Sequence, residues 1–215
     1  MEIDPAATVP VQDRRVRRSR SALMRATVAL VAERGTADVP LSDIAEAANV
    51  SRPVVYQHFG DRDRLLLESA LDLATRELLP RLADAGNSWS RWDGTLALVQ
   101  HFAHHRAFYR AALTSSCAYA LNKSLTALLV PINRQLVQDM FGGTLDPQRA
   151  DDLATFITGG AAALVNTWVV EGAEPLDPEE FTDRLVRLMP AATDKLRPHS
   201  MRGHSMPAHD KEPDQ

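Results

Sequence analysis

The chain has 215 residues, 45% of them hydrophobic, and a net charge of −4 at pH 7. This composition excludes a wholly disordered chain, and the single cysteine, Cys117, excludes an internal disulfide and a cysteine-ligated zinc site. No apolar run approaches the roughly 20 residues of a membrane span, and the first residues lack a signal-peptide pattern. We therefore expect a cytoplasmic protein with no membrane contact.

Two terminal segments lack a helical pattern. Residues 1–18 contain two prolines and a dense run of arginines, so we expect a disordered tail or a basic arm that contacts nucleic acid. Residues 193–215 are rich in proline, serine and histidine and are also expected to be disordered. Their histidines, His199, His204 and His209, recur every five residues, a spacing that fits no common zinc pattern.

Between these tails apolar residues recur at helical spacing, and no strand pattern is present. The first helix should end at Gly35, a usual place for a left-handed residue, while Asp61 and Asp177 should cap later helices. Pro131 should kink the helix that contains it. The expected helices cover about 23–34, 41–48, 52–59, 62–82, 95–105, 107–113, 118–140, 147–171 and 178–189. The sequence therefore predicts an all-α protein of about nine helices.

The most specific pattern in the chain lies in residues 41–59. Two short helices flank a tight turn at Asn49, a residue type that tolerates the positive φ that such a turn needs. Ser51 should cap the second of these helices. The outward face of that helix opens with Arg52, whose guanidinium can bond O6 and N7 of a guanine. The pattern favours a helix-turn-helix that reads DNA, and an ordinary helical hairpin is the alternative.

Four ungapped stretches extend this pattern across residues 23–67. They are Leu23-x-x-Ala26-Thr27-x-x-Leu30-x-x-x-x-Gly35, Asp43-Ile44-Ala45-x-x-Ala48-x-Val50-Ser51, Val55-Tyr56-x-His58-Phe59 and Asp61-Arg62-x-x-Leu65-Leu66. Together they resemble the DNA-binding module of the tetracycline-repressor (TetR) family. The resemblance implies a three-helix helix-turn-helix domain over residues 19–64 and a helical effector-binding and dimerisation domain over residues 65–192. It also implies a homodimeric repressor without a cofactor, released from a palindromic operator in double-stranded DNA by a small, largely apolar ligand.

The resemblance assigns DNA-contact roles to single positions. Tyr56 and His58 match positions that touch the DNA backbone, and Arg62 matches a lysine that holds a phosphate. Pro40 departs from the family's threonine at the start of the second helix, which puts that cap in doubt. The implied DNA-contact residues are Arg17, Arg18, Ser42, Arg52, Pro53, Val54, Tyr56, Gln57, His58 and Arg62.

The larger domain offers candidates for an effector pocket and for a dimer interface. Ligand sites between helices are mostly apolar with a few polar groups, and a run of small residues over 159–163 would let another helix approach closely. The candidate pocket residues are Trp92, Phe102, His105, Phe108, Tyr109, Tyr119, Ile132 and Phe156. The candidate interface residues are Gly160, Leu164, Trp168, Phe181, Leu185 and Leu188. For both sets the alternative is packing inside one chain.

The common enzyme signatures, such as a glycine-rich phosphate loop or HExxH, are absent. His101 and His105 are four residues apart and can share a helix face, but no carboxylate motif accompanies them, so we predict no metal site. Nothing marks Cys117 as a redox sensor. We therefore predict a protein that is not an enzyme. Two alternatives stay open, an effector-independent dimeric DNA-binding protein and a metal-dependent helical enzyme.

Overall fold

The computed structural model describes residues 11–86, 91–141 and 144–193, and these residues contain helices and no strand. The N-terminal helices are α1 (Val11–Arg34), α2 (Leu41–Ala47), α3 (Arg52–Phe59) and α4 (Arg62–Leu73), and α4 continues through the π-helix η1 (Ala74–Leu78) into α5 (Leu79–Gly86). They are followed by α6 (Arg91–His104), α7 (Arg106–Leu113), α8 (Ala118–Phe141), α9 (Pro147–Glu171) and α10 (Pro178–Thr193). Because α4, η1 and α5 run on without a break, the described part has nine separate helical rods, which confirms the predicted all-α class.

The first helix begins earlier than the sequence suggested. Residues 11–18, expected to be a loose arm, form the first turns of α1. The reason is that no proline or glycine lies between Val11 and Arg34, and arginine is among the better helix formers. The rest of the predicted terminal tails, residues 1–10 and 194–215, lies outside the described residues.

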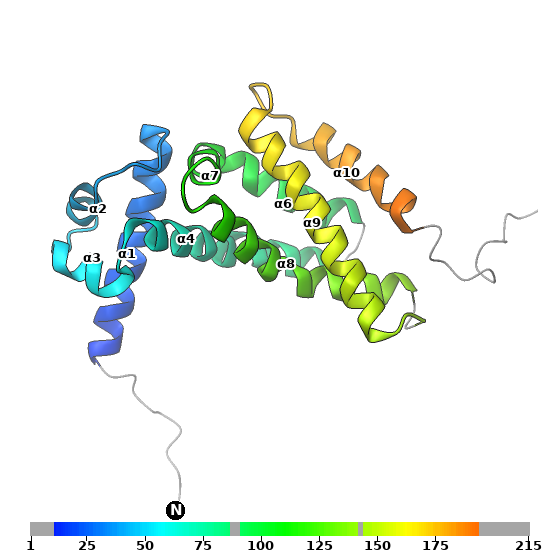
Figure 1. Cartoon of the computed structure of the whole chain (residues 1–215), viewed down its shortest axis with the longest axis horizontal. Coiled ribbons are helices and arrows are strands. Elements are labelled where there is room, and N and C mark those ends of the chain that lie inside the picture. Colours follow the sequence, from blue (N-terminus) through cyan, green and yellow to red (C-terminus); the bar gives the residue numbers. More distant parts are fainter. Residues whose placement is uncertain (1–10, 87–90, 142–143, 194–215) are drawn as a thin grey trace, which may run out of the picture.

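Figure 1 shows α1, α2 and α3 gathered at one end of the molecule, with α4 leaving this group and running into the larger helical domain. Within the group α1 packs against α2 and α4, and α2 packs against α3. In the larger domain the closest pairs are α8 with α9 and α6 with α10. The chain thus consists of a small N-terminal module joined to a helical body by one long rod and by the packing of α1 against α7.

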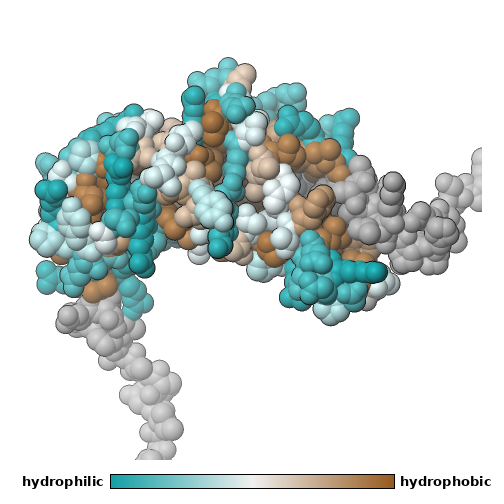
Figure 2. Space-filling view, viewed as in Figure 1, coloured by the Kyte–Doolittle hydropathy of each residue, from teal (hydrophilic) through white to brown (hydrophobic). Residues whose placement is uncertain are grey.

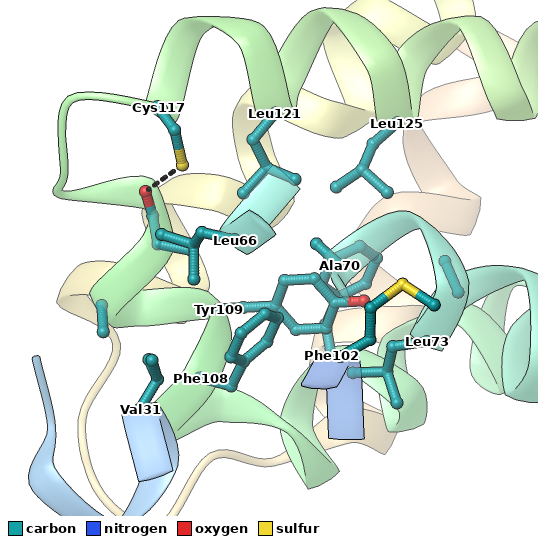
Figure 3. Close-up of a cluster of buried hydrophobic side chains, with 14 of the residues drawn as sticks. Val31, Leu66, Ala70, Leu73, Phe102, Phe108, Tyr109, Cys117, Leu121 and Leu125 are labelled. Atoms are coloured by element: carbon teal, nitrogen blue, oxygen red, sulfur yellow. Dashed lines mark hydrogen bonds between the residues drawn. The ribbon is translucent and has the colours of Figure 1, made fainter. Parts of the chain in front are cut away.

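One hydrophobic core connects the module to the body. Figure 3 shows Tyr109 of α7 at the centre of this core, beside Phe108 and Phe102, with Leu66 of α4 above it and Val31 of α1 below it in this view. Tyr109 and Phe108 have no exposed surface. The packing therefore continues across the expected domain boundary at residue 64, and the two-domain division stays a prediction.

A buried histidine lies within this core. His101 is 1% exposed, and its Nε2 lies 2.9 Å from the Tyr109 hydroxyl oxygen. Burial lowers the pKa of His101 to about 4, and the neighbouring His105 acts in the same direction. The charged groups that face it are Glu77, which raises the pKa, and Arg81, His104 and His105, which lower it. His101 is therefore neutral at pH 7.

Most of the predicted helix ends are confirmed. Gly35 has φ 65°, and the Asp61 and Asp177 carboxylates accept bonds from the amides of Arg64 and Glu180, at 2.8 and 2.9 Å. The predicted Ser51 cap is wrong, because its hydroxyl makes no capping bond. Pro53 has no amide to donate, and the Val54 amide donates instead to the Ser51 carbonyl at 3.0 Å.

The helix α9 is long and apolar enough, by length and composition alone, to cross a membrane. Thr155, Thr158 and Asn166 interrupt the apolar residues of α9, so no unbroken apolar run marks this property in the sequence. In the structure α9 lies along α8 and buries Leu153, Ile157 and Val165 in the body. A core helix of a soluble protein passes the same test, and this packing favours that interpretation.

Candidate nucleic-acid interface and effector cavity

The helix-turn-helix corner is built as predicted. Asn49 has φ 53°, and the amides of Asn49 and Val50 donate to the carbonyls of Glu46 and Ala45, at 2.9 and 3.0 Å. Val55 and Phe59 are buried on the inner side of α3. The corner therefore fixes which side of α3 faces away from the protein.

That outer side presents four of the predicted DNA-contact residues. Arg52, Pro53 and Gln57 are exposed, and Tyr56 keeps 48% of its surface accessible. The fifth, Val54, is half-buried. A guanidinium, a phenol and an amide on one open helix face supply the donors and acceptors that base edges and phosphates require.

The His58 side chain faces α1, away from the open side of α3. Its Nε2 lies 2.8 Å from the Ser19 hydroxyl oxygen on α1, and burial together with the nearby Arg20 charge lowers its pKa. The ring is therefore neutral at pH 7 and half-buried between α1 and α3. It joins two helices of the module, and in this position it brings no positive charge to a phosphate.

Arg20 is a structural residue that the sequence analysis missed. Its guanidinium donates to the His58 carbonyl at 2.8 Å, forms an ion pair with Glu68 of α4, and lies 4.5 Å from the centre of the Phe59 ring. One side chain of α1 thus holds α3 and α4 together. No signal in the sequence distinguishes Arg20 from the other arginines that precede it.

The remaining predicted contacts lie around the module. Arg62 is the first residue of α4, and its guanidinium forms an ion pair with the exposed carboxylate of Asp38 at 2.8 Å. To hold a DNA phosphate, Arg62 would have to exchange this carboxylate for the phosphate. Ser42 is exposed at the start of α2, and its hydroxyl bonds the neighbouring Asp43. Arg17 and Arg18 are exposed on the first turns of α1. The basic groups thus come from α1, α3 and the foot of α4.

Comparison with known proteins agrees with this geometry. Residues 23–69 match the bacterial regulatory proteins of the tetR family, and residues 90–191 match a transcriptional regulator C-terminal region. The chain belongs to the TetR family. It is therefore a DNA-binding transcriptional regulator of a non-enzymatic family. No curated protein matches it.

Solved structures share the fold of this TetR-family regulator. A putative TetR-family regulator from Rhodococcus sp. has a TM-score of 0.59 at 19% identity, over 81% of this chain and 98% of that one. The repressor AlkX from Dietzia sp., implicated in n-alkane biodegradation, has 0.53 at 21% identity, over 82% and 95%. NalD, the secondary repressor of the MexAB-OprM multidrug efflux pump in Pseudomonas aeruginosa, has 0.51 at 22% identity, over 81% and 96%.

The regulator has a cavity of about 240 Å³ between α6, α8, α9 and α10. Among the described residues, Asn133 and Thr95 are the polar side chains that border it, and no charged side chain of that part of the chain does. The Asn133 amide donates to the Thr158 hydroxyl at 2.8 Å. The other lining residues are Leu82, Gly94, Leu98, Leu129, Ile132, Leu136, Phe156, Ile157, Gly160, Ala161, Leu164, Leu185, Val186 and Leu188.

Only part of the predicted pocket borders this space. Ile132 and Phe156 line the cavity, and Phe102 lines a smaller one of about 50 Å³ beside it. Phe108 and Tyr109 are buried in the solid core, whereas Tyr119 is 80% exposed. Trp92 and His105 border neither of these two spaces. Aromatic rings fill the core here, and leucine and small residues surround the cavity.

The residues predicted for the dimer interface fall into a buried group and an exposed group. Phe181 and Leu185 are buried within their own chain, and the rings of Phe181 and Trp168 stack with centres 4.4 Å apart. The Trp168–Phe181 stack therefore joins α9 to α10 inside one protomer, and Leu164 is half-buried. The exposed residues on this side are Phe156, Gly159, Gly160, Ala163 and Leu188. In Figure 2, apolar surface interrupts the hydrophilic covering in the part of the molecule that α9 and α10 occupy.

Proposed function

We propose that this TetR-family regulator is a repressor that a small, largely apolar ligand releases from a palindromic operator. The observation that carries the proposal is the uncharged cavity between α6, α8, α9 and α10 in a chain whose α3 presents an open polar face. Ligand sites in proteins are mostly apolar clefts with a few polar groups, and Asn133 supplies such a group here. Two structural relatives, AlkX and NalD, are described as repressors.

The proposed DNA contacts follow from the geometry of the module. Arg52 stands at the N-terminal end of α3, the end that a helix-turn-helix inserts into the major groove. There its guanidinium reads a guanine, and Tyr56 and Gln57 bond bases or phosphates one turn further on. Arg62 holds a backbone phosphate after leaving Asp38. Arg17 and Arg18 reach the backbone beside the site.

The active form in this proposal is a homodimer in the cytoplasm. Its interface is the exposed side of α9 around Phe156 and Gly160, together with Leu188 of α10, since exposed apolar patches mark contact surfaces. The same three residues line the cavity, so this interface lies beside the proposed ligand site. A Cβ at the exposed Gly159 would meet no packed neighbour within 4 Å, and Gly159 lines neither cavity. Gly159→Arg should therefore leave the protomer folded and the cavity unchanged, and shift the sedimentation of the protein toward the monomer. Two recognition helices about 34–36 Å apart would then read the two operator halves.

The decisive experiment separates DNA binding from ligand response. DNA from the region upstream of the protein's own gene is labelled, its binding is followed by gel shift, and a library of lipophilic compounds is tested for release. Ala161 borders both cavities, so Ala161→Leu fills ligand space. The matched control is Ala120→Leu, at an exposed position of α8.

We expect both variants to bind the DNA, and we expect only Ala161→Leu to lose its response to the releasing compounds. If no compound releases the wild-type protein, the effector-independent alternative is favoured. If a releasing compound acts equally on Ala161→Leu, the cavity is not its binding site.

A further inference from the structure

Three side chains that can bind a metal ion meet where η1, α6 and α7 come together. They are Glu77 of η1, His101 of α6 and His105, which stands between α6 and α7. One ligand atom from each lies within 4.8 Å of the other two. None of the three borders the effector cavity, so this cluster is separate from the proposed ligand site.

The spacing of these atoms is close to that of a coordination shell. Zinc binds imidazole nitrogen and carboxylate oxygen at about 2.0–2.2 Å, so two ligand atoms of one tetrahedral ion stand about 3.3–3.6 Å apart. His105 Nε2 and the Glu77 carboxylate are 2.7 Å apart in a hydrogen bond, whose proton the ion would replace. Both side chains are partly exposed, at 16% and 36%, so side-chain rotations that move the ligand atoms by roughly 1 Å can bring all three to this spacing.

The backbone at Glu77 is unusual in a way that points to function. Residues 74–78 form a π-helix inside an otherwise α-helical rod, and π turns are rare and occur frequently at functional sites. A π turn holds one more residue than an α turn, which changes the direction of the side chains that follow by about 100°. Glu77 thus comes from a wide turn, and this observation is independent of the distances between the three ligand atoms.

A partner behind the cluster orients His101. The Tyr109 hydroxyl lies 2.9 Å from His101 Nε2, and Tyr109 has no exposed surface. When Nε2 donates its proton to that oxygen, Nδ1 keeps a free lone pair. Histidines that bind metals are held in this way by a hydrogen bond from the second ring nitrogen, which fixes both tautomer and orientation.

We propose that Glu77, His101 and His105 bind one divalent transition-metal ion of the zinc class. Two imidazoles and one carboxylate suit zinc and its neighbours, whereas magnesium and calcium prefer oxygen ligands throughout. Three protein ligands leave at least one coordination position for water. The ion joins the rod formed by α4 and η1 to the junction of α6 and α7.

The test uses the full-length chain without an affinity tag. His199, His204 and His209 are all changed to glutamine in every sample, so that the C-terminal histidines cannot contribute. Zinc binding is measured by calorimetry, and cobalt binding by visible absorption, which reports the coordination geometry. Operator DNA is left out, so that the outcome does not depend on the proposed repressor function.

We expect one zinc ion per chain, and at least tenfold weaker binding in Glu77→Gln and in His105→Gln. These two positions are partly exposed, and circular dichroism checks that both variants fold. His104→Gln is the matched control, because His104 is an exposed neighbour outside the cluster, and its affinity should be unchanged. Tyr109→Phe should weaken binding about 10- to 100-fold.

Two results would overturn the proposal. One is the absence of zinc binding by the chain that lacks the C-terminal histidines. The other is zinc binding that keeps its affinity when Glu77 and His105 are both replaced by glutamine.

Discussion

The hydrogen bond between Tyr109 and His101 should contribute measurably to stability. Both side chains are almost completely buried, so Tyr109→Phe leaves the Nε2 atom of His101 without a partner in the core. An unsatisfied buried polar group costs about 1–3 kcal/mol. For a chain of this size, 1 kcal/mol changes Tm by about 2–4 °C, so we expect Tm to fall by roughly 2–12 °C.

The assay is thermal and urea unfolding at pH 7 with a chelator present, so that bound metal does not contribute. Tyr119→Phe is the matched control, because it removes the same hydroxyl from a residue that is 80% exposed. We expect its free energy of unfolding to stay within about 0.5 kcal/mol of the wild type. The slope of free energy against urea concentration should be unchanged in both variants.

A double variant sharpens this prediction. When both partners of a buried hydrogen bond become apolar, the cost is much smaller than that of removing one. His101→Leu combined with Tyr109→Phe should therefore be more stable than the sum of the two single effects predicts. Additive single effects, or a Tyr109→Phe variant as stable as Tyr119→Phe, would refute the reasoning.

Three further predictions concern pH and DNA. Burial lowers the pKa of His101 from 6.5 to about 4. Between pH 4 and pH 6.5, His101 therefore binds a proton more readily in the unfolded chain than in the folded protein. The free energy of unfolding should fall by about 3 kcal/mol as pH drops through this window, and urea unfolding of His101→Leu should lack that component. Arg52→Ala should cost about 1–3 kcal/mol and relax specificity at one base position, and uniform weakening on all operator variants would contradict base reading. Arg62→Ala should weaken binding to every sequence alike and reduce the salt slope by about one, whereas an unchanged slope would exclude a phosphate contact.

The sequence predicted those features of the fold that depend on residues close together in the chain. Asn49 and Gly35 adopt positive φ because short-range sterics require such residues at these turns. The Asp61 and Asp177 caps depend only on residues three positions away. The ungapped spacing of apolar positions likewise predicted the exposed face of α3.

The features that the sequence left open depend on tertiary contacts. Glu77 approaches His105 only because η1 and α5 pack beside α6, and the apolar spacing carries no signal for a π turn. Aromatic residues were expected at the cavity, yet Phe108 and Tyr109 fill the core. Cavity position depends on where packing is incomplete, and residue type alone does not encode that.

The long rod and the Arg20 contacts together have a mechanical consequence. Arg20 fastens α1 and α3 to α4, so the DNA-reading module moves as one block with α4, and any such movement slides α1 along α7 of the body. At a rise of about 1.5 Å per residue, Arg62 lies about 22 Å from Glu77. A tilt of about 10° pivoted there swings the module by about 4 Å, which exceeds the 3.4 Å step between base pairs. A rotation of a few degrees between helices of the body is therefore enough to displace α3 from the base pairs that it contacts in the operator.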